Sequence, residues 1–416
     1  MSPSHKTGSS VLQIAPHTPP VKIEIALLTG GGDRPYALGL ASALLSKGFC
    51  LDFIGSDDLD CPELRRSSGL RFLNLRGSQH RDASLAKKVS RILIYYARLI
   101  RYASVSHPRI FHILWNNKFQ YFDRTVLMLY YRLLGKKVAF TAHNVNAGKR
   151  DSNDSLLNRI TLRIQYRLAD HIFVHTERMK RDLLEEFGVR EGAVTFIPFG
   201  INNSVPNTEM TPVEAKRRLG IKAADRTILF FGNIGPYKGL EFLVEAFQSL
   251  VAKNPGYRLI IAGSLRDGSK RYWCEIQRMI RRDPSLERVI ERIEYIPDEE
   301  TELYFKAADI LALPYTYVSQ SGVLLLAYSF GLPVIATDVG SLRDDIVEGK
   351  TGFLCRPRDS IDLARALETY FASGLFKTLD SRRQEIRDYA HARHSWDIVS
   401  ETTWKVYTRL LEEDGS

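Results

Sequence analysis

The chain has 416 residues, of which 44% are hydrophobic and 25% charged, and its formal net charge is +10. That length suits two domains, and that composition is typical of a folded globular protein rather than a disordered or fibrous one. Four scattered cysteines without a CxxC pair argue against a disulfide framework or a zinc site, and no apolar run is long enough to span a bilayer.

Strand-like and helix-like segments alternate through the first half of the chain. Residues 1–20 lack the apolar core of a signal peptide, so we expect a disordered tail and a cytoplasmic protein. Ile23–Thr29 is a short apolar run that ends in Gly30–Gly32, and a helical pattern follows over Arg34–Lys47. This alternation predicts a parallel, doubly wound α/β sheet. Further strands are expected at residues 51–54, 71–75, 110–114, 138–141, 171–174 and 194–197, with helices at 83–103, 124–134, 156–169 and 177–187.

The alternation lapses between Phe199 and Pro212, where Asn, Pro and Thr indicate a linker, and then restarts. Strands are expected at residues 227–231, 258–262, 310–313, 334–336 and 352–354, and helices at 240–251, 361–371, 381–390 and 396–412. We therefore expect an N-terminal Rossmann-like domain over residues 21–202, a linker over 203–212, a C-terminal Rossmann-like domain over 213–395, and a helix over 396–416 that packs back on the N-terminal domain.

Two facing domains of this kind surround one crevice with two sets of strand-end loops. Ligands of doubly wound sheets bind beyond the carboxyl ends of the strands, so a donor held by one domain can meet an acceptor held by the other. The charge of +10 has three candidate partners: nucleic acid, an anionic membrane and phosphorylated substrates. Nucleic acid is the least favoured, because the chain has no recognition motif and no basic tail with interleaved aromatic residues.

Two segments of the second half suit a phosphorylated ligand. In Phe230–Gly239, FFGNIGPYKG, a strand ends in a glycine turn and Lys238 stands at the start of a helix, which suits a diphosphate. In Ser319–Gly322, SQSG, hydroxyls and free backbone N–H groups converge at the start of an apolar helix. Taken singly, the first is equally compatible with an ordinary strand–turn–helix, and the second is more typical of an ordinary helix cap.

Together the motifs resemble those of family 4 glycosyltransferases with the GT-B fold, and they occur in the family's order over nearly the whole chain. The motif GLPVIATDVGSLRDDIVEGKTGF is the most specific to that family. The others are the glycine turn Gly30–Gly32, FTAHNV with His143, FIPFGIN at Phe196–Asn202, FFGNIGPYKG, LIIAG at Leu259–Gly263 and AADILALP at Ala307–Pro314.

The resemblance implies a retaining hexosyltransferase that uses a UDP- or GDP-sugar and a glycan or lipid-linked acceptor. His143 and Lys238 are the implied catalytic residues, His143 beside the transferred sugar and Lys238 on the donor diphosphate. No metal or other cofactor is expected. The implied donor-binding residues are Gly31, Gly32, Asn233, Lys238, Gly263, Ile296, Gln320, Ser321, Gly322 and Val323.

Two positions depart from the family pattern. Asn233 stands where the family usually has arginine, and Leu326 stands where a glutamate usually holds the donor ribose. Nothing near Val318–Gln320 is acidic, although a subgroup with a QSG signature also lacks these glutamates. Two alternatives therefore stay open: a sugar-nucleotide epimerase of similar fold, and a catalytically impaired nucleotide-sugar-binding protein.

Three further features have a functional and an ordinary interpretation. His143 also fits a hydrogen-bonded, half-buried histidine at a strand end. Asp58-Leu59-Asp60 matches the DxD metal motif of another glycosyltransferase fold, but its polar loop favours a solvated acidic turn.

Ala86–Tyr102 is a basic amphipathic helix that fits an anionic membrane at the inner face of the cell. Its place within the strand alternation favours a core-facing helix instead. The apolar face expected for that helix consists of Val89, Ile92, Leu93, Tyr96, Leu99 and Ile100.

Overall fold

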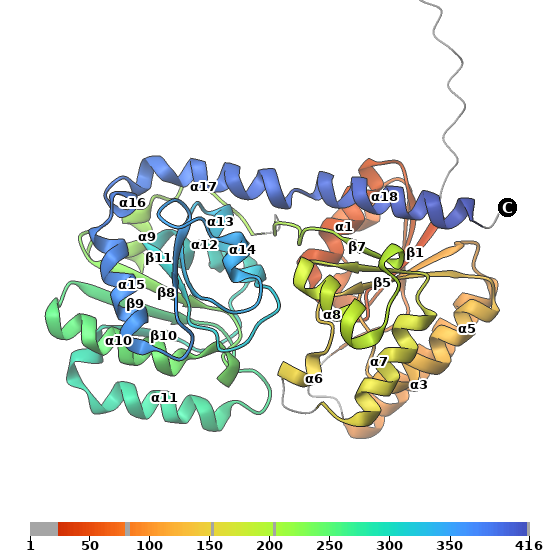
Figure 1. The fold of residues 1–416 in the computed structure, drawn as a ribbon, viewed down its shortest axis with the longest axis horizontal. Helices are drawn as coiled ribbons and strands as arrows, with labels where there is room; N and C mark the ends of the chain where they lie inside the picture. Colours follow the sequence, from red (N-terminus) through yellow and green to blue (C-terminus); the bar gives the residue numbers. More distant parts are fainter. Residues whose placement is uncertain (1–23, 80–83, 151–153, 203–204, 414–416) are drawn as a thin grey trace, which may run out of the picture.

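The computed structural model describes residues 24–79, 84–150, 154–202 and 205–413, so the tail expected over residues 1–20 lies outside it. The described chain forms two α/β domains joined side by side (Figure 1). Each is built on one parallel sheet, seven strands in the first and six in the second. The expected doubly wound architecture is confirmed.

The first sheet has the order β3-β2-β1-β4-β5-β6-β7, and all its neighbouring strands run parallel. Side chains alternate across it, so that Ile25 and Leu27 pack on one face and Ala26 and Leu28 on the other. The strands are β1 (Glu24–Leu28), β2 (Cys50–Gly55), β3 (Leu70–Asn74), β4 (Ile110–Ile113), β5 (Lys137–Ala142), β6 (His171–Val174) and β7 (Val194–Phe196).

Helices cover both faces of this sheet. One face carries α1 (Arg34–Ser46) and the C-terminal α18 (Trp396–Glu412). The other carries α3 (Leu85–Val105), α5 (Met128–Leu133), α7 (Leu156–Leu168) and α8 (Glu177–Phe187). The helix expected over 124–134 starts earlier than predicted, as a single turn α4 (Gln120–Phe122) and a π-helical turn (Asp123–Leu127) that lead into α5.

The second sheet repeats the order with one strand fewer, β10-β9-β8-β11-β12-β13, again all parallel. Its strands are β8 (Arg226–Phe231), β9 (Tyr257–Ala262), β10 (Val289–Arg292), β11 (Ile310–Leu313), β12 (Val334–Thr337) and β13 (Gly352–Cys355). The helices around it include α9 (Pro212–Arg218), α10 (Leu240–Lys253), α11 (Lys270–Arg282), α12 (Asp298–Ala307), α13 (Gly322–Ser329), α15 (Ser360–Ala372) and α17 (Leu379–His394).

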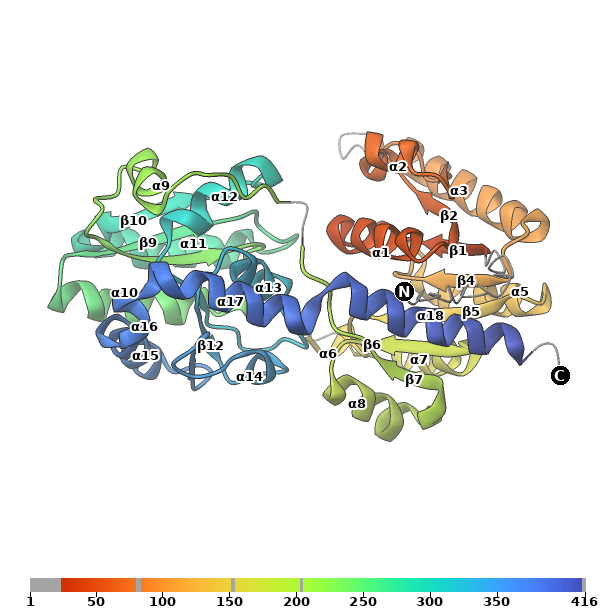
Figure 2. The same cartoon turned by 90° about the horizontal axis from the view of Figure 1, so that it is seen from above.

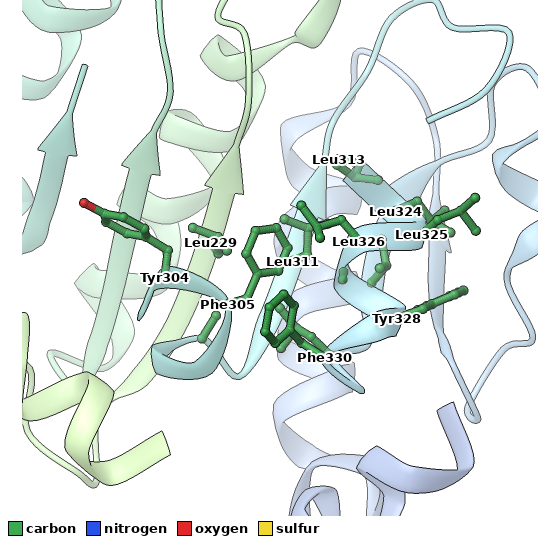
Figure 3. Packing of buried hydrophobic residues seen from close by; sticks show 14 of the residues in the cluster. Leu229, Tyr304, Phe305, Leu311, Leu313, Leu324, Leu325, Leu326, Tyr328 and Phe330 are labelled. Atoms are coloured by element: carbon green, nitrogen blue, oxygen red, sulfur yellow. The ribbon is translucent and has the colours of Figure 1, made fainter. Parts of the chain in front are cut away.

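One of the two core clusters of the second domain lies where α12 and α13 meet this sheet, and the other lies under α10, α11 and α15. Figure 3 shows Phe305 of α12 and Phe330 after α13 packed against Leu311 of β11. Leu326, at the position where the family usually has a glutamate, belongs to this apolar cluster and is 7% exposed. At this position, therefore, the chain has a core residue rather than a polar ligand.

The C-terminal segment ties the domains together. After α17 of the second domain, α18 crosses to the first domain and lies along α1 (Figures 1 and 2). The indole N–H of Trp396 donates to the carbonyl of Ile201 at 2.8 Å, and the Tyr407 hydroxyl contacts His112 Nδ1 at 2.6 Å. Where the chain passes from the first domain to the second, α9 begins at Pro212, inside the segment expected to be linker. It begins there because Thr211 caps the helix and proline suits its first turn.

Strand order reverses between β1 and β4 in the first sheet and between β8 and β11 in the second. These two reversal points are where doubly wound sheets bind ligands, because the flanking helices leave the strand ends on opposite sides. The loops that follow the four strands contain the glycine turn, Trp115, Lys238 and the SQSG segment. Among the described residues, no helix combines the length and apolarity that crossing a bilayer requires.

Candidate active site

A cavity of about 230 Å³ lies between the two domains, at the reversal points of both sheets. We call it the interdomain cavity. It brings together six of the residues that the sequence singles out. They are His143, Lys238, Gln320, Ser321, Gly322 and Val323, and the rest of the lining is Asp33, Trp115, Asn144, Phe199, Tyr237, Val318 and Ser319.

Lys238 is buried in the second domain's wall of this cavity, 8% exposed. It ends a 3₁₀ turn (Pro236–Lys238) directly before α10. Its ammonium donates to the Tyr315 hydroxyl at 2.5 Å and lies 3.8 Å from the centre of the Tyr315 ring. Burial therefore puts a positive charge in a site of low dielectric constant, where its effect on a bound anion is stronger than in water.

His143 forms the facing wall, in the first domain, directly after β5. Its ring stacks on Trp115, with centroids 4.1 Å apart and planes 4° from parallel. His143 Nδ1 lies 3.1 Å from Nε2 of His175, and His175 Nδ1 lies 3.1 Å from the carbonyl oxygen of Ile197. His143 Nε2 is buried without a hydrogen-bond partner among the described residues.

This chain of contacts fixes where the protons are. Burial lowers the pKa of His175 to about 4, and burial followed by the charge of His175 holds the pKa of His143 well below its usual range. Both rings are therefore neutral near pH 7. Because a carbonyl only accepts, His175 Nδ1 carries the proton and its Nε2 accepts from His143 Nδ1–H. His143 Nε2 is left as an acceptor, on a side chain that lines the interdomain cavity.

The start of α13 supplies backbone donors from the second domain. Ser321 caps the helix by accepting from the backbone N–H of Leu324 at 3.4 Å. The first N–H groups of a helix have no intrahelical partner, so those of Gly322 and Val323 suit an anion. Ser319 donates to Asn144 Oδ1 at 3.2 Å and joins the two walls of the cavity.

The glycine turn of the first domain is held by two large side chains. Gly31 has a φ of +76°, which disfavours any other residue, and a Cβ there would lie 1.9 Å from Nη1 of Arg76. A Cβ on Gly32 would lie 2.0 Å from the Trp115 indole. Gly31 and Gly32 themselves are exposed, at the edge of the cleft. Gly31 is therefore in contact with a guanidinium group that the sequence analysis did not single out.

Five of the ten predicted donor-binding residues do not line the interdomain cavity: Gly31, Gly32, Asn233, Gly263 and Ile296. Asn233 is exposed and accepts a hydrogen bond from Ser264 at 2.9 Å. Gly263 has a φ of +144°, and a Cβ there would lie 2.0 Å from the carbonyl oxygen of Gly232, so glycine is required by backbone packing. The side chain of Ile296 belongs to the apolar core, which leaves only its backbone for a ligand.

A second cavity, of about 930 Å³, adjoins the glycine turn, and we call it the basic cavity. Four cationic side chains line it and only two carboxylates do. The cationic residues are Arg76, Lys88, Arg91 and Lys118, and the carboxylates are Asp58 and Asp267, the latter from the second domain. Arg76 and Lys118 follow β3 and β4, so their positions at strand ends are the signal that the sequence analysis missed.

Arg76 has the most informative surroundings in the basic cavity. Its Nη1 is buried and has no hydrogen-bond partner among the described residues. A buried N–H group without a partner is costly, and a guanidinium is shaped to bind a carboxylate or phosphate with two bonds. Beside it, the Tyr95 hydroxyl donates to Asn117 Oδ1 at 2.7 Å, which gives the cavity a fixed polar wall.

The acidic turn lies at the rim of the basic cavity. Asp57–Leu59 forms a 3₁₀ turn, and Asp60 pairs with Arg65 through a 2.7 Å hydrogen bond. The DxD carboxylates therefore differ in their surroundings, since Asp58 lines the cavity and Asp60 does not. In the described ranges of the chain, no three His, Cys, Asp or Glu side chains converge in a way that could hold a metal ion.

Comparison with known proteins assigns the chain to a class of enzymes. Residues 30–205 match the family model described as Glycosyltransferase Family 4, and residues 225–373 match the one described as Glycosyl transferases group 1. The chain is a glycosyltransferase of the family 4 and group 1 type. The two matches cover one domain each, and the interdomain cavity of this glycosyltransferase lies between them.

Relatives and solved structures cover almost the whole glycosyltransferase. The D-inositol 3-phosphate glycosyltransferase of Corynebacterium diphtheriae is 25% identical over 95% of this chain and 94% of its own. The fold is similar to sucrose-phosphate synthase from Thermosynechococcus elongatus, with a TM-score of 0.74, 19% identity, and coverage of 94% of this chain and 100% of that one. Anabaena HepE in complex with UDP-glucose gives a TM-score of 0.71 at 16% identity, with coverage of 93% and 100%. The glycosyltransferase therefore has the GT-B fold.

Proposed function

We propose that this glycosyltransferase transfers a hexose from a UDP- or GDP-sugar, with retention of anomeric configuration, to a hydroxyl of an acceptor that also carries an anionic group. The observation that carries the proposal is a pair of groups, the buried Lys238 and the partly buried His143, that line one cavity from opposite domains. The solved complex of Anabaena HepE with UDP-glucose supports a nucleotide-sugar donor.

The donor diphosphate is proposed to bind between Lys238 and the start of α13. As the sugar–phosphate bond breaks, negative charge grows on the departing diphosphate. Lys238 and the N–H groups of Gly322 and Val323 offset that charge without having to reorganise. Asp33 lines the same cavity, and its carboxyl restricts where an anion fits.

His143 is proposed to orient the sugar rather than to carry charge. Its neutral ring offers Nε2 as an acceptor, so a sugar hydroxyl is the complementary donor. His175 keeps the ring in this tautomer, and Trp115 keeps its plane fixed. The role assigned to His143 thus rests on its contacts and not on acid–base chemistry.

The acceptor is proposed to bind in the basic cavity, with its anionic group on Arg76. Arg76 contacts the glycine turn on one side, and Asp33, at the end of that turn, lines the interdomain cavity on the other. We propose that the incoming hydroxyl and the departing diphosphate meet on one face of the sugar, which would give retention. The name of the Corynebacterium relative, a D-inositol 3-phosphate glycosyltransferase, supports a phosphorylated acceptor.

The proposal is tested by measuring nucleoside diphosphate release with paired acceptors. UDP- and GDP-hexoses are first screened by thermal shift, since a donor at a hundred times its Kd adds about 2.7 kcal/mol to stability. The stabilising donor is then given with D-inositol 3-phosphate, with inositol, and with a lipid-linked sugar phosphate in detergent. We expect release only with phosphate-bearing acceptors, and product NMR should give the donor's anomeric configuration.

Two results would overturn the proposal. Faster release with inositol than with either phosphate-bearing acceptor would exclude an anionic acceptor. Conversion of the nucleotide sugar into an isomer without any acceptor would identify an epimerase instead. The two phosphate-bearing arms also separate a soluble acceptor from a lipid headgroup.

A further inference from the structure

Exposed apolar side chains are concentrated on one side of the first domain. Of the twenty large hydrophobic residues that are exposed in the described chain, thirteen lie between Val89 and Ile164. Leu93 of α3 is 58% exposed, Leu133 of α5 is 77% exposed and Leu156 of α7 is 75% exposed. The expected core-facing stripe of α3 is thus only partly correct, because Tyr96 and Leu99 are buried while Val89 and Leu93 face outward. The full set is Val89, Leu93, Ile94, Val105, Phe119, Tyr121, Val126, Leu129, Leu133, Leu156, Leu157, Ile160 and Ile164.

The helices on the same side carry almost only positive charge, although Arg132 pairs with Asp170 and Arg159 with Asp154, both just beyond the ends of α7. Across α3, the segment from α4 to α5, and α7, the only acidic residue is Asp123, which is buried and accepts from the Tyr96 hydroxyl at 2.9 Å. Exposed cations alternate with the apolar side chains. They are Lys87, Arg98 and Arg101 on α3, Arg132 on α5, and Arg159, Arg163 and Arg167 on α7. We call the exposed side chains of these helices the docking face.

The helices of the docking face form one continuous surface. The Tyr130 hydroxyl of α5 donates to the carbonyl of Ile100 in α3 at 3.3 Å, and Arg124 Nη1 donates to Asn158 Oδ1 of α7 at 2.8 Å. Figure 1 shows α3, α5 and α7 together along the outer side of the first domain. This surface also reaches the site, because Lys88 of α3 lines the basic cavity.

The neighbouring α8 provides an internal contrast. It packs on the same face of the sheet, through Met179, Leu183 and Phe187. Its outer side carries Glu185 and Glu186 and none of the exposed large hydrophobic residues. Exposed apolar side chains are therefore not a general property of the helices on this sheet face.

We infer that the docking face binds the surface of an anionic lipid bilayer. Leucine and isoleucine side chains between arginines suit the boundary between headgroups and acyl chains, and each cation near an anionic surface adds about 1 kcal/mol. A second copy of this chain is disfavoured as the occupant, because two such faces would bring like charges together. Where the proposed function also holds, docking brings the basic cavity close to lipid headgroups.

Vesicle sedimentation of the full chain tests this inference. The probes are vesicles of phosphatidylcholine alone and vesicles that also contain phosphatidylglycerol. The test variant is the double substitution Leu93→Glu and Leu133→Glu, and the matched control is Ile361→Glu, at a residue of α15 that is 73% exposed in the second domain. We expect binding only to the vesicles that contain phosphatidylglycerol, at least about tenfold weaker for the double variant and unchanged for the control.

Several outcomes would contradict docking. Equal binding of the double variant and the native chain would exclude the docking face, and binding to neither vesicle would exclude the bilayer. A dimer of the native chain in solution that the double variant loses would assign the face to a second copy. Leu93 and Leu133 line neither cavity, so turnover of a soluble acceptor should be retained, which separates failure of docking from failure of the proposed function.

Discussion

The two domains share one strand order but place their functional groups differently. In the second domain, Lys238 and the start of α13 each lie within a short continuous motif, next to the strand that positions them. In the first domain, Arg76, Trp115 and His143 follow three different strands, β3, β4 and β5, and meet only through the sheet. The donor side can therefore be inferred from local sequence, whereas the acceptor side depends on topology.

The domains also differ in how many histidines they contain. Burial lowers the pKa of His112 and His171 to about 3 and that of His175 to about 4, and His143 is shifted in the same direction. All four lie in the first domain. The second domain has only two histidines among its described residues, His391 and His394, both on α17. The first domain thus contains several neutral rings whose protonation is incompatible with the folded state.

Mild acid should therefore destabilise the first domain selectively, and this is the largest effect we expect. Below the ordinary pKa of 6.5 the unfolded chain binds protons that the folded rings do not, so stability is complete above that pH and falls as the pH drops towards 4. Each histidine contributes up to about 1.4 kcal/mol per pH unit. Hydrogen exchange at pH 7 and pH 5 should show faster opening of β4, β5 and β6 than of β8 and β11. Earlier opening of the second domain would contradict this account.

Removing the positive charge of Lys238 should have the next largest effect. We expect Lys238→Met, which retains side-chain volume, to lower turnover by roughly ten- to a thousandfold, the range for losing one group that stabilises developing charge. Steady-state release of nucleoside diphosphate measures this. Lys253→Met, at an exposed lysine on α10 that pairs with Glu368, is the control and should keep full activity. Near-normal turnover of the Lys238 variant would remove Lys238 from the mechanism.

Removing the positive charge of Arg76, in the first domain, should weaken only the binding of the acceptor. Arg76→Gln should raise KM for a phosphorylated acceptor by about ten- to a hundredfold, because a hydrogen bond to a charged group contributes about 1.5–3 kcal/mol. The KM for the donor should not change. Arg98→Gln, at an exposed position of α3 outside the basic cavity, is the matched control. If Arg76→Gln raised both KM values equally, Arg76 would belong to the donor site.

Local patterns determine how much of the molecule can be predicted from sequence. β6 and α18 have the predicted bounds, because a buried apolar run and a capped amphipathic segment are local signals. α11 and β10 were not predicted, although Trp273 and Ile276 have helical spacing, because charged residues dominate both segments. The contact between Arg76 and Gly31 could not be predicted, since β2 separates their strands and only the register brings them together.

The smallest expected effect shows which of the two domains α18 stabilises. The Tyr407 hydroxyl of α18 contacts buried His112 in the first domain, and the Tyr370 hydroxyl of α15 donates to the carbonyl of Asp309 at 2.5 Å in the second. Replacing either tyrosine by phenylalanine leaves one buried polar group without its partner, which costs about 1–3 kcal/mol. We expect Tyr407→Phe to weaken protection of β4 in hydrogen exchange and Tyr370→Phe to weaken that of β11. If Tyr407→Phe instead weakened the protection of β11, α18 would stabilise the second domain although it packs on the first.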